Sequence, residues 1–197
     1  MATVREGNKG VLLVVDVQVG VMREAWEAPR IIRNVARAVE RARAQGVPVI
    51  WVQHGDNELP VGSPEWQWVP ELAPAPDELL IPKRFNSAFE QTPLEDELAR
   101  LGAAHIALAG ASTNFCIRAT AYAALDRGYD LTLIKDAHST DTLELEGGLR
   151  IDAATIVHDL NITMTWLNYP GRQNATATAE QIDFAAPGGG TQGSASP

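Results

Sequence analysis

The chain has 197 residues, of which 45% are hydrophobic and 21% are charged, a composition typical of one globular domain with a sizeable core. Its formal net charge of −9, without any visible basic patch, argues against a nucleic-acid partner. No apolar run is long enough to span a bilayer, residues 1–10 lack the apolar stretch of a secretion signal, and a single cysteine cannot form an internal disulfide. We therefore expect a cytoplasmic protein with no membrane partner.

Hydrophobic periodicity predicts strands that alternate with helices along the chain. Val11–Val15 is a continuous apolar run, which is typical of a strand buried on both faces of a parallel sheet. Further strands are expected at 47–52, 79–81, 105–109, 130–134 and 162–167, and helices at 31–46, 93–101, 114–127 and 151–160. Residues 54–78 contain five prolines and predict a long loop, and loops of this length in compact domains tend to be functional.

This alternation predicts an α/β fold, a three-layer α/β/α domain with a mainly parallel sheet of about six strands. We expect one domain over residues 1–184. Residues 185–197 are rich in Gly, Ser and Pro and predict a disordered tail.

Three reactive residues follow predicted strands. Asp16 ends the first strand, Lys83 ends the third, and Cys116 lies just past the fourth, where a helix should begin. Ligands of such folds bind beyond the carboxyl ends of the strands, so these side chains are expected at one rim. Each also has an ordinary structural interpretation: a loop-capping carboxylate, a surface cation and a small buried packing residue.

The position of Cys116 suits a nucleophile. A thiol in the first turn of a helix is close to the positive end of the helix dipole, which predicts a lowered pKa and a thiolate. The free backbone N–H groups of the same turn could hold an oxyanion. Asp16 would act as general base towards the thiol, and Lys83 would stabilise the thiolate and orient the carboxylate.

Four segments together resemble the isochorismatase-like cysteine hydrolases: Leu13–Gln18, Lys83–Phe89, Gly110–Ala121 and Tyr129–Ala137. The resemblance covers roughly residues 10–167. It implies a Rossmann-like sheet with an Asp16-Lys83-Cys116 triad and attack of the thiol on a carbonyl to form a thioester. It also implies a cis peptide bond between Ala111 and Ser112, with the N–H groups of Ser112 and Cys116 as the oxyanion hole.

Within this family, the presence of Cys116 and the small number of histidines indicate which type of reaction to expect. Isochorismatases proper hydrolyse a vinyl ether without a nucleophilic cysteine at this place, so Cys116 favours C–N hydrolysis. Nicotinamidases carry a metal site built from an Asp-x-His motif and further histidines after the second strand. Here that region reads Trp51–Asp56, and the next histidine after His54 is His105. We therefore expect no metal and no cofactor, and a place among the metal-independent, streptothricin-hydrolase-like amidases.

Aromatic and amide side chains near the reactive segments predict a pocket for a small-molecule substrate. The candidates are Phe115, beside the nucleophile, and Trp66, Phe85, Phe89 and Asn86. Trp66 could equally pack in the core or cover a subunit interface, and His54 is interpreted as a hydrogen-bonded structural residue. A homo-oligomer, dimer or tetramer, is expected from the resemblance.

Two alternatives to a metal-independent amidase stay open. An ether hydrolase of the isochorismatase type would tolerate Cys116→Ser and form no acyl-enzyme. A catalytically silent, flavodoxin-like binding domain would have an unreactive thiol with a pKa near about 8.5.

Overall fold

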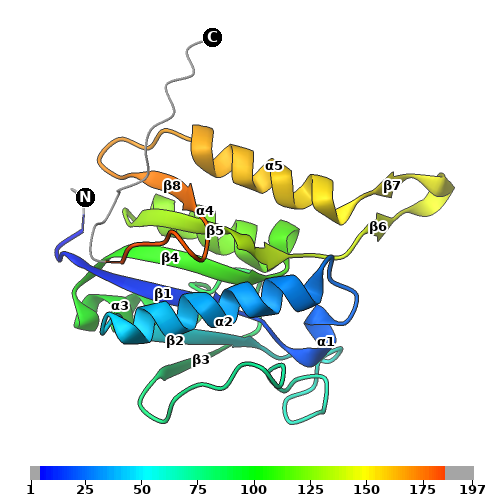
Figure 1. The fold of residues 1–197 in the computed structure, drawn as a ribbon, viewed down its shortest axis with the longest axis horizontal. Coiled ribbons are helices and arrows are strands. Elements are labelled where there is room, and N and C mark those ends of the chain that lie inside the picture. The colour runs from blue at the N-terminus through cyan, green and yellow to red at the C-terminus, as the bar shows by residue number, and fades with distance from the viewer. Residues whose placement is uncertain (1–4, 185–197) are drawn as a thin grey trace.

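The computed structural model describes residues 5–184, so the predicted tail at 185–197 lies outside the described residues. Within residues 5–184 a six-stranded parallel sheet has the order β3-β2-β1-β4-β5-β8 (Figure 1). Its strands are β1 Lys9–Val15, β2 Val49–His54, β3 Leu79–Lys83, β4 Ala103–Ala111, β5 Asp130–Ser139 and β8 Asn174–Ala177. The predicted α/β fold with a parallel sheet of six strands is confirmed.

Helices cover both faces of this sheet (Figure 1). They are α1 Val19–Met22, α2 Ala28–Ala44, α3 Leu94–Leu101, a π-helical turn η1 Thr113–Ile117, α4 Arg118–Asp126 and α5 Ala153–Trp166. A small antiparallel pair, β6 Leu143–Glu144 and β7 Arg150–Ile151, projects beyond the sheet and encloses the 3₁₀ turn η2 Glu146–Gly148 (Figure 1). None of the helices in the described part is long and apolar enough to cross a membrane.

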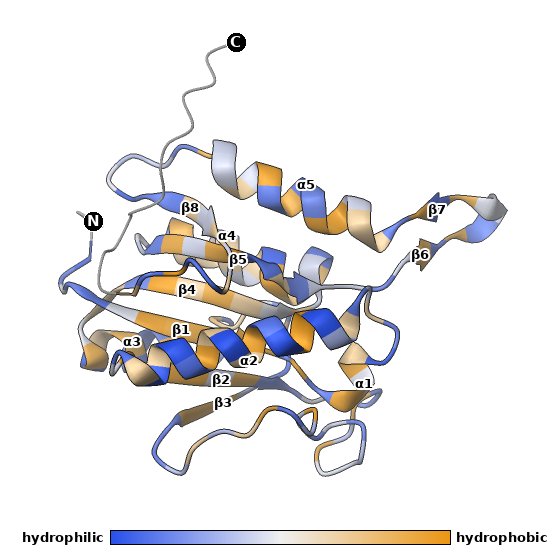
Figure 2. Ribbon diagram, in the orientation of Figure 1, coloured by the Kyte–Doolittle hydropathy of each residue, from blue (hydrophilic) through white to orange (hydrophobic). Residues whose placement is uncertain are grey.

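The alternation of side chains along β1 divides the core into two clusters. Val11, Leu13 and Val15 pack in the cluster with α3, α4 and α5, whereas Leu12 and Val14 pack in the cluster with α2. All five side chains are fully buried, as expected for a central strand of a parallel sheet. Figure 2 shows the apolar strands and the alternating polar and apolar stripes of α2, whose apolar side faces the sheet.

The predicted strand at 162–167 is wrong, because these residues form the end of α5 and its C-cap. Ile162, Met164 and Trp166 alternate with threonines in the manner of a strand. However, Met164 continues the buried face of α5 at helical spacing from Leu160, while Ile162 and Trp166 point outward. The packing of one helical face therefore outweighs the local alternation.

The sixth strand is instead β8, the edge strand Asn174–Ala177, which pairs with β5. Its sequence of small and polar residues is only half-buried and carries no apolar pattern from which a strand could be predicted.

A second difference concerns the helix expected at 114–127. It begins as the π-helical turn η1, in which the Ile117 N–H bonds to the Ser112 carbonyl, and only then becomes α4.

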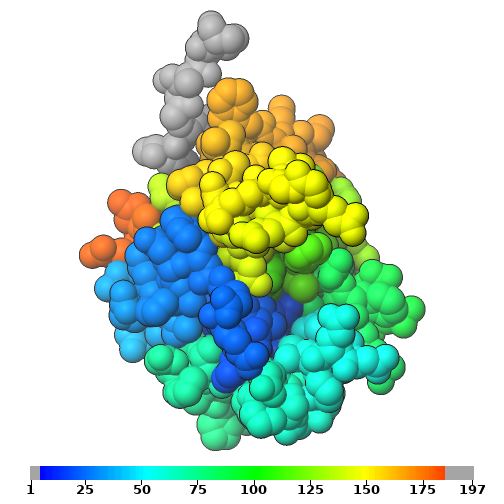
Figure 3. Space-filling view, turned by 90° about the vertical axis from the view of Figure 1, so that its right-hand side faces the viewer, coloured from blue at the N-terminus to red at the C-terminus, as the bar shows by residue number. Residues whose placement is uncertain are grey.

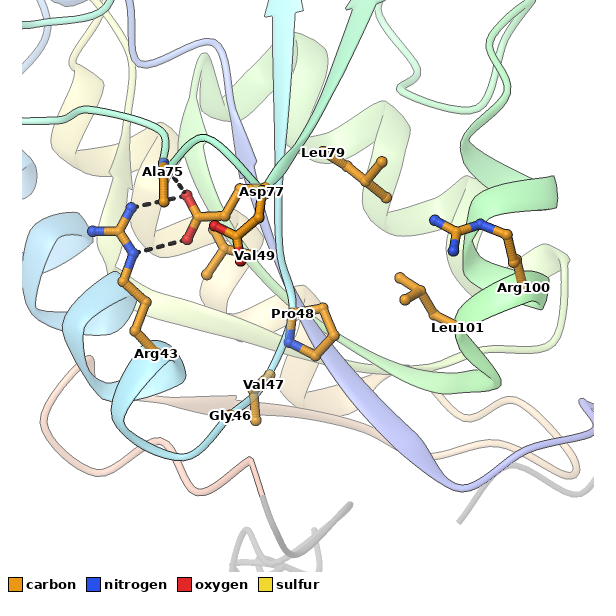
Figure 4. A pocket seen from close by; sticks show the side chains of 11 residues that line it. Arg43, Gly46, Val47, Pro48, Val49, Ala75, Asp77, Leu79, Arg100 and Leu101 are labelled. Atoms are coloured by element: carbon orange, nitrogen blue, oxygen red, sulfur yellow. Dashed lines mark hydrogen bonds and ion pairs between the residues drawn. The ribbon is translucent and has the colours of Figure 1, made fainter.

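The long loop after β2 returns to the sheet through the carboxylate of Glu78. That carboxylate accepts hydrogen bonds from the Arg43 guanidinium, at 2.8 Å from Nε and from Nη2, from Trp51 Nε1 at 2.7 Å and from the Ala75 N–H at 2.8 Å. Arg43, Ala75 and Glu78 line a cavity of about 620 Å³ at the amino-terminal edge of β2 and β3, where dashed lines mark the bonds to Arg43 (Figure 4). No cysteine or histidine lines that cavity, and its two arginines, Arg43 and Arg100, are paired with Glu78 and Glu97. The bonds of Glu78 therefore anchor the loop at the edge of the sheet opposite the reactive residues.

Candidate active site

The carboxyl ends of the parallel strands bring the three reactive residues together. Asp16 follows β1, Lys83 ends β3, and Cys116 lies in η1 directly after β4. Figure 3 looks onto this edge of the sheet and shows a hollow among the chain segments that surround it. The cavity there measures about 420 Å³, and its lining includes Asp16, His54, Asn86, Ser112, Phe115 and Cys116.

The Lys83 ammonium is the centre of the group. Its Nζ lies 2.6 Å from Asp16 Oδ2 and 3.2 Å from Cys116 Sγ. Two further acceptors, the Phe85 carbonyl oxygen and His54 Nδ1, are each 3.2 Å away. The Lys83 side chain is completely buried and that of Asp16 is 2% exposed. A buried ammonium is stable only with such partners, so Lys83 is held by the site and is not a surface cation.

The electrostatics of the site corrects the prediction of a thiolate at Cys116. Burial, together with the charge of Asp16, raises the pKa of the Cys116 thiol to about 12 against the opposing effect of Lys83. The short η1 turn does not outweigh this desolvation. Burial also raises the pKa of Asp16 above its ordinary value, although the Lys83 ammonium opposes the shift. The resting site therefore holds a protonated thiol beside a carboxylate of raised proton affinity.

The turn between β4 and η1 is held in place by close backbone packing. Gly110 has φ +127°, and a Cβ there would lie 1.9 Å from the Val15 carbonyl oxygen, so only glycine fits. The peptide bond between Ala111 and Ser112 is cis, as the family resemblance implies. The Thr113 hydroxyl is 2.9 Å from Nδ1 of the buried His138, which fixes the first residue of η1.

The residues predicted to bind substrate are divided between three places. Phe115 and Asn86 line the cavity of the nucleophile, and Asn86 Oδ1 is 4.0 Å from Cys116 Sγ. Trp66 and Phe85 line a neighbouring cavity of about 480 Å³. Phe89 is buried in the core against the ring of Tyr129, with centroids 5.9 Å apart. Phe89 is therefore a packing residue, because its ring is directed into the core and away from the cavity.

One polar residue at this edge, Gln18, was not predicted as part of the site. The buried side-chain amide of Gln18 accepts the His54 N–H at 3.0 Å and donates to the His54 carbonyl at 3.0 Å. It also donates to the Trp66 carbonyl at 2.8 Å. Gln18 thus joins the end of β1 to the end of β2 and to the long loop. Its place two residues after Asp16 was the only signal in the sequence.

The potential metal ligands at this site do not form a metal-binding cluster among the described residues. Among residues 5–184 no three or more His, Cys, Asp and Glu side chains are placed to hold a metal ion. His54, the one histidine of the site, directs both ring nitrogens at protein groups, Lys83 Nζ and Asp56 Oδ2.

Comparison with known protein families gives one match along most of the chain, to the Isochorismatase domain, over residues 10–147. Two curated relatives are streptothricin hydrolases from Streptomyces noursei, 34% identical over 145 residues and 32% identical over 135 residues. These alignments cover 70% and 66% of this chain but 57% and 49% of the relatives, so the chain spans about half the length of the curated relatives it matches.

Solved structures with the same fold include an isochorismatase from Pseudomonas putida KT2440. It is 27% identical, with a TM-score of 0.77, and the match covers 89% of this chain and 90% of the other. A cysteine hydrolase from Pseudomonas syringae pv. phaseolicola 1448A has a TM-score of 0.76 at 23% identity, covering 87% and 90%, a likeness of fold alone.

Proposed function

Because the chain belongs to the isochorismatase-like hydrolase family, we propose that it is a cysteine hydrolase that cleaves a C–N bond of a small-molecule amide. The reaction would pass through a thioester on Cys116. The observation that carries this proposal is the buried Lys83 ammonium, which lies 2.6 Å from Asp16 Oδ2 and 3.2 Å from Cys116 Sγ beside an open cavity.

The first half of the reaction forms the thioester and releases the amine. Cys116 Sγ attacks the substrate carbonyl carbon while the thiol proton passes to the Asp16 carboxylate. A preformed thiolate is not needed, because a carboxylate of raised pKa accepts the proton as the C–S bond forms. The N–H groups of Ser112 and Cys116 would hold the oxyanion. The C–N bond then breaks, and Asp16 returns the proton to the leaving nitrogen.

The second half hydrolyses the thioester. Asp16 takes a proton from a water molecule, whose oxygen attacks the thioester carbonyl. Collapse of the second oxyanion breaks the C–S bond and releases a carboxylic acid. The proton returns from Asp16 to the Cys116 sulfur. Lys83 stays an ammonium throughout and stabilises the carboxylate and the developing thiolate in turn.

The experiment is a panel of amides and ureides scored by release of ammonia or amine. Streptothricin belongs in the panel, since two relatives are named for its hydrolysis. Cys116→Ala is the blank, and Cys116→Ser separates the alternatives. An ether hydrolase would release no amine from the panel and would keep its turnover of a vinyl ether in the serine variant, whereas a silent binding domain would turn over nothing.

We also predict that the protein acts on a small molecule, is located in the cytoplasm and forms a homo-oligomer. Light scattering coupled to gel filtration measures the last of these directly.

A further inference from the structure

His54 is built into the same site from the neighbouring strand. In the pairing of β2 with β3, His54 and Lys83 are direct partners, so their side chains lie side by side at the sheet edge. The His54 backbone is fixed on both sides by the Gln18 amide, and its side chain is 18% exposed. The ring is therefore held against the ammonium by two strands and one buried side chain.

The two ring nitrogens of His54 have different partners. Nδ1 lies 3.2 Å from Lys83 Nζ, and Nε2 lies 2.9 Å from Asp56 Oδ2. An ammonium has only hydrogens to offer, so Nδ1 must accept. A carboxylate accepts only, so Nε2 must carry the proton. Both contacts require the same neutral tautomer, with its hydrogen on Nε2.

Asp56 is well placed to select that tautomer. Its other oxygen, Oδ1, accepts the backbone N–H groups of Glu58 and Leu59, each at 2.8 Å, which fixes the carboxylate. At Gly55, between the two residues, a Cβ would lie 2.8 Å from Val61 Cγ2, so the loop after β2 approaches this residue closely. His54 and Asp56 thus form a fixed hydrogen-bonded pair, in which the free nitrogen of the imidazole ring faces Lys83.

From this geometry we propose that His54, with its tautomer set by Asp56, is a positioning residue that holds the Lys83 ammonium against Asp16 and Cys116. The inference deepens the proposed function and rests on it for its role in turnover. Lys83 shares three N–H groups among four acceptors, and Nδ1 is the acceptor that holds the ammonium from the side of β2. Without it the ammonium is freer to turn away from the thiol, and stabilisation of the developing thiolate weakens.

Three variants separate positioning from simple structural support. His54→Leu removes the acceptor. His54→Asn restores an acceptor, because its amide oxygen can take the place of Nδ1. Asp56→Asn keeps Oδ1 for the backbone of Glu58 and Leu59 but offers an N–H group to Nε2, which favours the wrong tautomer. His158→Leu, on the exposed side of α5 against Trp26, is the matched control.

The main readout is the rate at which iodoacetamide alkylates Cys116, the only cysteine of the chain, measured by intact-protein mass spectrometry. It needs no knowledge of the substrate. We expect His54→Leu and Asp56→Asn to slow alkylation by roughly 10- to 100-fold, the loss expected for one hydrogen bond to a charged group. His54→Asn and His158→Leu should stay within about threefold of the wild type.

A second readout is the tautomer itself, observed by two-bond ¹H–¹⁵N correlations on protein labelled at histidine, with His54→Asn identifying the His54 signals. We expect the hydrogen on Nε2 in the wild type and on Nδ1 in Asp56→Asn. Unchanged alkylation in both His54→Leu and Asp56→Asn, or a wild-type hydrogen on Nδ1, would overturn the inference. Failure of the proposed function looks different, because no amide is then hydrolysed while alkylation still depends on Asp56. If substrate turnover is found, kcat should fall in parallel with alkylation while KM changes little.

Discussion

Lys83 Nζ lies 2.6 Å from Asp16 Oδ2, and both side chains are almost completely removed from solvent. Neither charge is stable alone at this depth, because desolvation of an ion costs several kcal/mol. The pair therefore exists only as a unit, and Lys83 Nζ also lies 3.2 Å from the Cys116 thiol, from the Phe85 carbonyl and from His54 Nδ1. This coupling gives the site consequences for stability as well as for reactivity.

Removal of one partner should destabilise the protein. We expect Lys83→Met to lower the free energy of unfolding by roughly 3–5 kcal/mol, because the Asp16 carboxylate is left buried without its counter-ion. In the double variant with Asp16→Asn the loss should be smaller than the sum of the two single losses. Urea denaturation monitored by fluorescence measures all three. Additive losses would show that the two charges do not depend on each other.

The reactivity of Cys116 should not follow the ionisation of an ordinary thiol. Because burial raises the thiol pKa to about 12, the proposed mechanism requires alkylation to proceed with Asp16 as the base. The rate should therefore be flat between about pH 7 and about pH 9, without the rise near 8.5 that a free thiol shows. Asp16 must be unprotonated to act, and its pKa is raised, so the rate should fall with decreasing pH at values above the ordinary range of an aspartate.

Asp16→Asn is the control for that profile. Without the base, alkylation should be slow at neutral pH and should rise continuously towards high pH as the thiol itself ionises. A wild-type rate that rises with a midpoint near about 8.5, or that persists in Asp16→Asn at neutral pH, would contradict the assignment of Asp16 as base.

Close packing at Gly110 predicts a severe effect of one methyl group. We expect Gly110→Ala to lower the free energy of unfolding by about 3 kcal/mol or more, because the new Cβ would lie 1.9 Å from the Val15 carbonyl oxygen. Gly46→Ala is the matched control, since Gly46 also has a positive φ, +65°, but no atom lies within 4 Å of its Cβ position. That variant should lose only about 1–2 kcal/mol, the cost of the left-handed backbone. Equal losses in thermal or urea unfolding would contradict the close approach of β4 to β1.

Two buried histidines predict loss of stability in mild acid. Burial lowers the pKa of His105 and of His138 to about 4, whereas both would titrate near 6.5 in the unfolded chain. Between these values the unfolded state binds protons that the native state does not, so stability falls as the pH drops from about 6.5 to about 4. Each histidine contributes roughly 2 kcal/mol of this loss at pH 5.

Urea denaturation at pH 7 and pH 5 measures the effect. His105→Gln removes one titrating group, so its stability should fall by about 2 kcal/mol less than that of the wild type between the two pH values. An equal fall in both proteins would contradict a neutral, buried His105.

The sequence predicted the place of the reactive residues better than their electrostatics. Asp16, Lys83 and Cys116 each follow a strand, and the carboxyl ends of parallel strands meet at one edge, so their convergence followed from local pattern and topology alone. The protonation state of Cys116 could not be predicted in this way. It depends on burial by side chains from distant segments and on the nearby Asp16, neither of which is visible in the short helical turn around the cysteine.

Contacts across strands and long loops were the hardest to predict. His54 was interpreted as a structural residue because its partner Lys83 is 29 positions away and becomes its neighbour only through the register of β2 and β3. Trp66 lines a neighbouring cavity because the loop after β2 places it there, and Phe85, just after the end of β3, lines the same cavity. The misassigned strand at 162–167 has a similar cause, since tertiary packing along α5 decided its structure.

The most direct test of the proposed mechanism is intact-protein mass spectrometry of enzyme quenched with acid during turnover of whichever amide releases ammonia or amine. We expect a mass increase equal to the acyl part of the substrate. Peptide mapping should locate it on Cys116, and it should be absent from Cys116→Ala, which should also release no amine. Undiminished turnover by Cys116→Ala, without any adduct in the wild type, would contradict a thioester and with it the assignment of Cys116 as nucleophile.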